Sequence, residues 1–149
     1  MDYIKRCIDG VFIVSNKSFK ENKGLVSYIQ ELCLNDGSSM NGRIEFSKHL
    51  LQSKSKVPFF VSEDILLVPT HSIRNYDCAL INLFNVCEVR KSYSGLKLSF
   101  VSGNILEVSI SRHIWMNQLQ KANALVDNYA KRKCLHYGLI DRFYYENLV

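Results

Sequence analysis

Two short stretches combine arginine or lysine with small polar side chains, a combination that suits a polyanionic ligand. The first contributes Ser38, Ser39, Asn41, Arg43, Lys48, Lys54 and Lys56. The second contributes Thr70, Ser72, Arg74 and Asn75. Cations at phosphate spacing hold a nucleic-acid backbone, while arginine and short polar side chains can enter a groove. The two stretches therefore predict a DNA-binding surface.

Both stretches also have ordinary structural explanations. Gly37 suits the left-handed end of a helix, and Ser38, Ser39 or Asn41 can cap the helix that follows. The lysines can belong to a solvated helix face, and the residues at 68–75 can form a plain connection between strands. These explanations leave Arg43 unassigned. The narrow minor groove of A/T-rich DNA has a negative potential that favours arginine insertion, which gives Arg43 a role.

The sequence lacks the common enzyme motifs. It contains no P-loop, no G-x-G-x-x-G, no G-x-S-x-G and no His-Glu-x-x-His. A Cys78 nucleophile with His71 as its base is supported by composition alone. We therefore expect a protein that is not an enzyme and that holds no cofactor and no metal.

Composition indicates one ordered globular domain that spans residues 1–149. Apolar residues make up 47% of the chain and charged residues 22%, and no low-complexity tract divides it. The net charge is +5, which favours a polyanionic partner. The longest apolar runs fall far short of the ~20 residues of a membrane span, and the N-terminus has no signal-peptide segment. The expected location is cytoplasmic, without a membrane partner.

Five cysteines are spaced without close pairs, which argues against a disulfide framework and against a zinc site. We expect free, buried thiols. They are Cys7, Cys33, Cys78, Cys87 and Cys134.

Helical periodicity predicts three helices that would position the polar stretches. Apolar residues recur at helical spacing from Leu25 to just before Asn35, and a second helix is expected from about Asn41 to Gln52. A long amphipathic helix should follow Ser111, with Lys131-Arg132-Lys133 in its last turn. The aromatic segment at 139–148 can form a further helix that packs on the sheet or on a second subunit.

The middle of the chain predicts strands. The run at 11–14 reads as a short buried strand, followed by a polar turn at 15–24. From Val57 to Ile110, apolar runs broken by turn residues predict four or five antiparallel strands, with a hairpin around Ser102-Gly103-Asn104. The predicted fold class is α+β: an antiparallel sheet meander with two helices in the N-terminal half and a long C-terminal amphipathic helix.

The succession of several small motifs resembles the ComK family of competence transcription factors. These motifs are Gly37-Ser38-Ser39 with Gly42-Arg43, Lys56-Val57-Pro58, Leu67-Val68-Pro69-Thr70 with Ser72 and Arg74, Cys78, Ser99-Phe100-x-Ser102-Gly103, Ser109 and Gln118-Leu119-x-x-Ala122. They follow in the family's order from about residue 25 to residue 125. The chain departs from the family where Ala79-Leu80-Ile81 replaces a tryptophan, and in lacking the tail motif for adaptor-controlled degradation. It resembles a short, diverged member.

The resemblance implies a DNA-binding activator of genes for DNA uptake. Such a protein would recognise paired A/T-rich boxes, mainly through the minor groove. It would act as a homo-oligomer, a dimer or a tetramer, in the cytoplasm at the nucleoid, with RNA polymerase as a further partner.

Two other hypotheses remain open at this point. The strands after Val57 and the helix after Ser111 also suit a pleckstrin-homology-like module that binds anionic lipid or a protein partner. Alternatively, the chain is a paralogue that modulates a full-length regulator without binding DNA itself.

Overall fold

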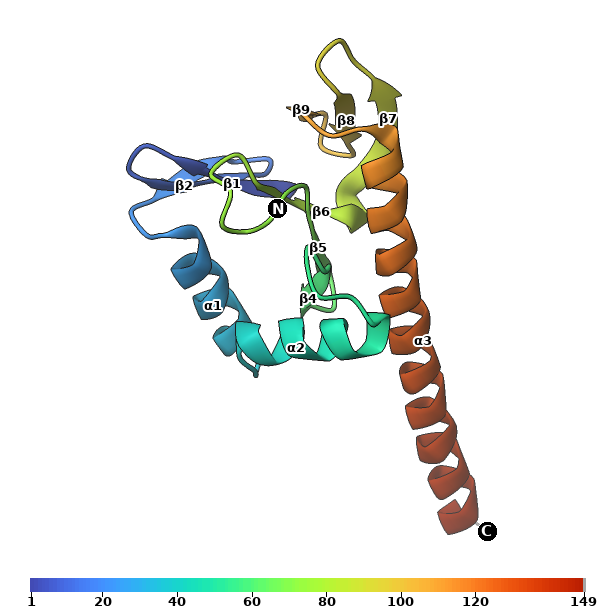
Figure 1. Cartoon of the computed structure of the whole chain (residues 1–149). Helices are drawn as coiled ribbons and strands as arrows, with labels where there is room; N and C mark the ends of the chain where they lie inside the picture. The colour runs from blue at the N-terminus through green and yellow to red at the C-terminus, as the bar shows by residue number, and fades with distance from the viewer. Residues whose placement is uncertain (149) are drawn as a thin grey trace.

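The computed structural model describes the backbone of residues 1–148 and the side chains of residues 1–133. Helices α1 (Leu25–Asn35) and α2 (Met40–Leu51) cover one face of a six-stranded antiparallel sheet. A three-stranded antiparallel sheet and the long helix α3 (Arg112–Leu148) cover the other face (Figure 1). The six-stranded sheet is therefore the middle layer of three.

The six-stranded sheet joins the two halves of the chain, with the order β3-β2-β1-β6-β5-β4. Its strands are β1 (Tyr3–Cys7), β2 (Gly10–Val14), β3 (Phe19–Glu21), β4 (Phe59–Ser62), β5 (Ile65–Pro69) and β6 (Ala79–Asn82). The smaller sheet is a meander of β7 (Val86–Lys91), β8 (Leu96–Phe100) and β9 (Ile105–Val108). The N-terminal strand β1 lies between β2 and β6, with Ile4 opposite Leu80.

Two hydrophobic cores lie on opposite faces of the six-stranded sheet. Because successive side chains of a strand point to opposite faces, Ile4 and Leu80 pack under α1 and α2, while Tyr3 and Ile81 pack toward α3 and the smaller sheet. Both faces are covered, so strands such as β5 are continuously apolar.

The predicted α+β class, with antiparallel sheets and three helices, is confirmed. Three details of the strand prediction were wrong. The strand at 3–7 was not predicted, and the polar turn at 15–24 contains β3. The middle strands divide between two sheets, because a 3₁₀ turn at Leu83–Asn85 separates β6 from β7.

The division of the strands removes the support for a pleckstrin-homology-like module. That hypothesis needed one meander from Val57 onward. Instead, β6 pairs with β1, and the strands after it form a separate sheet.

Helix α3 is longer than predicted. Lys131-Arg132-Lys133 lies within it and not in its last turn, because the helical backbone continues to Leu148. Figure 1 shows this lower part running past the body of the molecule. The backbone of the aromatic segment at 139–148 is helical, but the packing of its side chains lies outside the described residues.

One arrangement occurs twice in the fold without repeated sequence: three antiparallel strands followed by a helix. The first unit is β1-β2-β3-α1 and the second is β7-β8-β9-α3. In each, a glycine with positive φ, Gly10 (φ 148°) or Gly95 (φ 157°), begins or precedes the second strand. A Cβ atom there would come within 2.1 Å of a carbonyl oxygen of the third strand, that of Glu21 or Val108. Each helix then begins four residues after that carbonyl.

The described cysteines are free, but only some are buried. Cys33 and Cys78 are buried, and burial raises the pKa of both thiols. Cys7 is half-buried and Cys87 is exposed, so the prediction of buried thiols fails for these two. The side chain of Cys134 lies outside the described residues. In the part of the chain that the structure describes, no helix is long and apolar enough to cross a membrane.

Candidate nucleic-acid interface

The N-terminal end of α2 is held together by the side chains predicted to bind DNA. Ser39 caps the helix: its Oγ accepts a hydrogen bond from the backbone N–H of Gly42 at 3.0 Å. This satisfies one of the amide donors that a helix start leaves unpaired. Ser38 and Asn41 are exposed beside it.

Arg43 is largely buried, with only 15% of its side chain exposed. Its Nη1 donates to the carbonyl oxygen of Val61 at 2.6 Å, and its Nη2 donates to that of Cys33 at 3.0 Å. Nη1 also donates to the carbonyl oxygen of Phe60, and both nitrogens contact the carboxylate of Asp36. The guanidinium therefore ties α1, α2 and β4 together.

The opposite end of α2 opens into a cavity of about 400 Å³. Its basic and polar lining combines both predicted stretches: Lys48, Lys54, Ser55, Lys56, Ser72 and Arg74. Its floor is apolar and includes Ile44, Val57 and Phe59. Cations that are distant in the sequence thus face one another here.

The loop after α2 is shaped by left-handed residues and by a buried glutamine. Gln52 and Lys56 have positive φ values of 51° and 49°. Gln118 of α3 is 2% exposed, and its Nε2 donates to the carbonyl oxygens of Lys56 at 2.9 Å and Pro69 at 2.7 Å. Gln118 therefore holds both walls of the cavity in place, because Lys56 belongs to the loop that forms one wall and Pro69 comes just before the loop that forms the other.

A second cavity, of about 410 Å³, adjoins the first through Lys56 and runs along α3. Lys121 lines it and donates from Nζ to the carbonyl oxygen of Ser55 at 3.2 Å. Burial, and then the neighbouring Lys56 charge, lower the pKa of Lys121. We call the two cavities together the basic groove, with Lys48, Lys54, Lys56, Ser72, Arg74 and Lys121 as its basic and hydroxyl residues.

Two residues of the second predicted stretch shape their own loop. Thr70 is 1% exposed, and its Oγ1 accepts from the backbone N–H of Ala79 at 2.9 Å. The Oδ1 of Asn75 accepts from the backbone N–H of Asp77 at 2.9 Å. Ser72 and Arg74, between them, remain exposed at the basic groove.

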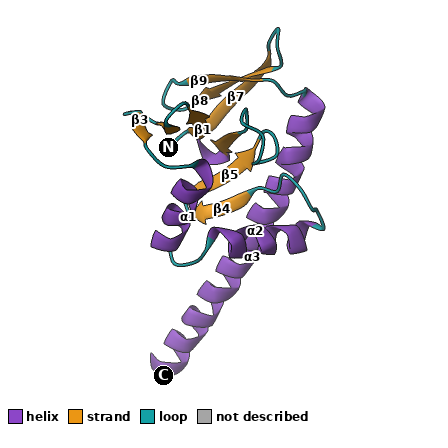
Figure 2. Ribbon diagram, turned by 60° about the vertical axis from the view of Figure 1, so that its left-hand side comes forward, coloured by secondary structure: helices purple, strands orange, loops and turns teal. Residues whose placement is uncertain are grey.

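The structure therefore separates the predicted site residues. It brings Lys48, Lys54, Lys56, Ser72 and Arg74 together. It places Ser38, Ser39, Asn41 and Arg43 toward the other end of α2, a helix roughly 17 Å long. Figure 2 shows α2 beneath β4, crossing α3.

Within residues 1–133, the basic groove is lined by cations without an acidic residue among them. None of the described residues that line its two cavities is Asp or Glu. Within residues 1–133, the ion pairs lie elsewhere: Lys23–Glu31, Arg43–Asp36, Arg90–Glu88 and Lys133–Glu63. An arrangement of this kind attracts a polyanion, and its geometry alone does not select which one.

Comparison with known proteins supplies the family. The family model described as "ComK protein" matches residues 3–133. The chain belongs to the ComK family. The ComK match spans both sheets, α1, α2, all of the basic groove and the described side chains of α3. No curated protein and no solved structure matches the chain.

Membership of the ComK family decides the broad class. ComK is a family of competence transcription factors and not of enzymes. This agrees with the class predicted from the basic stretches and the motif order.

Sequence reasoning did not single out Lys121 or Gln118 as site residues. Lys121 belonged to a noted basic cluster, but only the packing of α3 against the loop at 53–56 places it beside Lys56. The spacing of Gln118 indicated a position on the buried face of a helix. A glutamine on such a face was the available signal, because a buried amide needs partners.

Proposed function

We propose that this ComK protein is a DNA-binding transcriptional regulator that activates competence genes and holds A/T-rich duplex DNA in its basic groove. The supporting observation is the convergence of five cations from α2, two loops and α3 on adjoining cavities that no described acidic residue lines. Lysines that meet phosphates release counterions, which favours binding and makes it dependent on salt.

Different residues of the basic groove would have different roles. Lys54, Lys56 and Lys121 would meet backbone phosphates. Burial, and then repulsion from Lys56, lower the pKa of Lys121, and a phosphate between the two lysines would favour its charged form. Arg74, an exposed guanidinium beside Ser72, has the donors needed to reach base edges in the minor groove.

The remaining predicted residues would act in two ways. Ser39, Arg43, Thr70 and Asn75 would shape the surface, because their polar atoms already bond within the protein. Ser38 and Asn41 would contact DNA where a duplex extends along α2, because the length of this helix, roughly 17 Å, is about half a turn of B-DNA.

We further propose that the protein acts as a homo-oligomer with RNA polymerase, in the cytoplasm at the nucleoid. Paired boxes of DNA match an even number of identical subunits, because the symmetry of the site then mirrors that of the protein.

Fluorescence anisotropy on two labelled duplexes of equal length, one with spaced A/T tracts and one G/C-rich, tests the proposal at several salt concentrations. Arg74→Ala should weaken binding to the A/T duplex by roughly 1–3 kcal/mol, and Lys54→Ala should lower the salt slope by about one. Lys20→Ala, an exposed lysine of β3 outside the basic groove, is the matched control and should bind like the wild type.

Three results would contradict the proposal. Equal, salt-labile binding to both duplexes would reduce the basic groove to non-specific attraction. Binding only in mixed multimers with another regulator would identify a modulating paralogue. Binding to anionic vesicles, with none to either duplex, would point to a lipid surface.

A further inference from the structure

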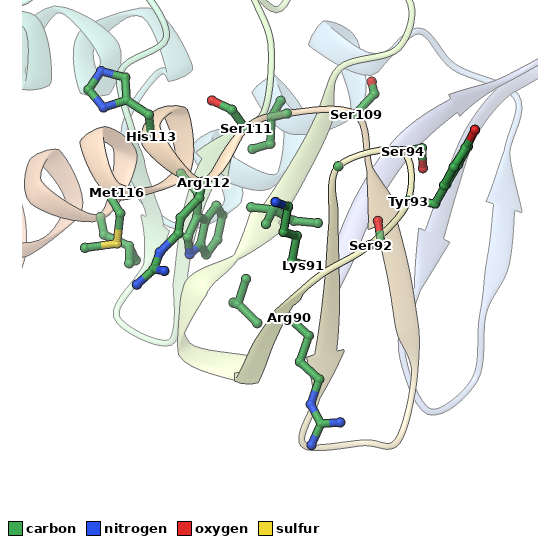
Figure 3. A pocket seen from close by; sticks show the side chains of 16 residues that line it. Arg90, Lys91, Ser92, Tyr93, Ser94, Ser109, Ser111, Arg112, His113 and Met116 are labelled. Atoms are coloured by element: carbon green, nitrogen blue, oxygen red, sulfur yellow. The ribbon is translucent and has the colours of Figure 1, made fainter.

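Another basic cavity, which we call the hairpin cavity, lies between the β7–β8 hairpin and the first turns of α3 (Figure 3). Its volume is about 1020 Å³. Arg90 and Lys91 come from the end of β7, while Arg112 and His113 begin α3. Figure 3 shows Lys91 on the hairpin and Arg112 on α3, with His113 pointing away from both. No acidic residue is among the described residues that line it.

Most of this charge is uncompensated. Arg90 pairs with the carboxylate of Glu88 through Nε at 2.7 Å. Within residues 1–133, no carboxylate forms an ion pair with Lys91 or Arg112. Two full positive charges are therefore open to an anion.

The cavity also presents hydroxyl groups, and one of them has an unmet bonding need. Ser111 caps α3, since its Oγ accepts from the backbone N–H of Ile114 at 3.2 Å. The Oγ of Ser92 is buried and has no hydrogen-bond partner in the described structure. A buried hydroxyl without a partner costs free energy, and this one lies in the hairpin turn that lines the cavity.

The first three-stranded unit shows that this arrangement need not leave a cavity. The carbonyl oxygens of Glu21 and Val108, which the two glycines approach, occupy equivalent places in the two units. Leu25 and Arg112 follow them by four residues, and Ile29 and Met116 follow them by eight. Leu25 and Ile29 are 2% and 0% exposed and close the space under α1. Met116 is 45% exposed and Arg112 is also exposed, so the second unit is open and basic where the first is filled.

The hairpin tip beside the cavity carries a fully exposed aromatic ring. Tyr93 lies between Ser92 and Ser94 in the β7–β8 turn and points outward from it (Figure 3). The corresponding tip of the first unit exposes Ile8, but beside the acidic Asp9. Rigid aromatic or apolar side chains at such tips can stack on or wedge between bases.

The hairpin cavity and the basic groove lie along the same part of α3. His113 lines the cavity, while Asn117 and Lys121 line the basic groove, and the three lie four residues apart on one stripe of the helix. His113 and Asn117 approach to 3.5 Å. The stripe spans roughly 12 Å, which is short enough for one duplex to meet both ends.

We propose that this cavity binds a backbone phosphate of the same DNA that occupies the basic groove, and that Tyr93 reaches into the groove of the duplex beside that phosphate. The inference rests on the proposed function, because it adds a second contact to the same ligand. Lys91 and Arg112 would hold the phosphate, and the β7–β8 hairpin would set the angle of the duplex.

Site-specific photocrosslinking tests the contact directly. The full-length protein with p-benzoylphenylalanine in place of Tyr93 should crosslink to the A/T duplex under ultraviolet light. The same replacement of Ile8, the equally exposed tip of the first unit, should not. In anisotropy, Tyr93→Ala should weaken binding roughly tenfold, and Lys91→Ala with Arg112→Ala should lower the salt slope by about two. Lys20→Ala remains the control.

The outcomes separate this inference from the proposed function. Wild-type binding that Arg74→Ala weakens, while the Tyr93, Lys91 and Arg112 variants bind normally, would overturn the second contact and leave the basic groove intact. Crosslinking from Ile8 as strong as from Tyr93 would also overturn it. Failure of the wild type to bind any duplex would overturn both proposals together.

Discussion

The two ends of α2 carry similar residues in opposite states. At the N-terminal end, Arg43 is buried and gives its terminal nitrogens to carbonyl oxygens of α1 and β4. At the C-terminal end, Lys48, Lys54 and Arg74 are exposed around an open cavity and pair with no described carboxylate. This difference shows that a cation stabilises the fold where backbone carbonyl oxygens lie close enough to accept its hydrogen bonds. Without such acceptors, the cation remains available to a ligand.

The largest expected effect comes from replacing the buried Arg43 at the N-terminal end of α2. Arg43→Met keeps an apolar stem but leaves the carbonyl oxygens of Cys33, Phe60 and Val61 without a donor. The free energy of unfolding should fall by about 2–4 kcal/mol, measured by urea denaturation. Arg74→Met, the control at the exposed end, should change it by about 0.5 kcal/mol or less. A stable Arg43→Met variant that loses DNA binding would break the comparison.

Gln118→Leu tests whether the exposed end depends on one internal clamp. The substitution leaves the carbonyl oxygens of Lys56 and Pro69 unpaired, so the protein should lose about 2 kcal/mol of stability. DNA affinity should fall as well, because both walls of the basic groove lose their anchor. Asn123→Leu, at an exposed position of the same helix outside the basic groove, is the control for unfolding and for binding. Unchanged stability would show that the clamp is unimportant.

Ser39→Ala sharpens the comparison at the buried end. The variant loses the cap on Gly42 and should be destabilised by about 1 kcal/mol in urea denaturation. Ser38→Ala, one residue earlier and exposed, should change stability by about 0.5 kcal/mol or less. A reversed order of the two effects would mean that Ser38 and not Ser39 starts the helix.

The smallest effect concerns the pH dependence of the exposed end. Folding lowers the pKa of Lys121. At pH values between its pKa in the folded protein and its ordinary pKa, the unfolded chain therefore binds more protons than the folded one. The free energy of unfolding rises with pH across that window. Lys121→Met lacks this rise. Any neutral-pH advantage of the variant, about 0.5 kcal/mol or less, should therefore disappear as the pH rises through the window.

The same Lys121→Met variant should lower the salt slope of DNA binding by about one. Lys20→Met provides the control for both measurements. An advantage of Lys121→Met that grew toward alkaline pH would mean that the folded protein stabilises charged Lys121. Burial and the neighbouring Lys56 charge would then be the wrong explanations.

Local patterns predicted the helices but not all of the strands. The predicted starts of α1 and α2 lie within one residue of the observed ones, because apolar spacing and capping are local features. Strand β1 was missed because Lys5 and Arg6 interrupt its apolar residues, so it neither alternates nor forms a continuous apolar run. The Asp9-Gly10 dipeptide before an apolar run was a usable hairpin signal.

The site was predicted in composition but not in arrangement. The acceptors of Arg43 in β4 lie 17 and 18 residues further along the chain. The bond from Gln118 to Lys56 spans 62 residues. Spacing in the sequence carries no record of such partners, so it could not distinguish the buried arginine from the exposed one.

The pairing of β1 with β6 has a consequence during protein synthesis. Strand β1 ends at Cys7, and its partner begins at Ala79, so the first strand leaves the ribosome long before the strand it must join. At ~5–20 residues per second, the delay is roughly 4–15 s. During that time the nascent chain exposes an unpaired strand edge that other chains or chaperones can engage. A ribosome pause before Ala79 would lengthen this interval, while one after Asn82 would let the two halves of the sheet close first.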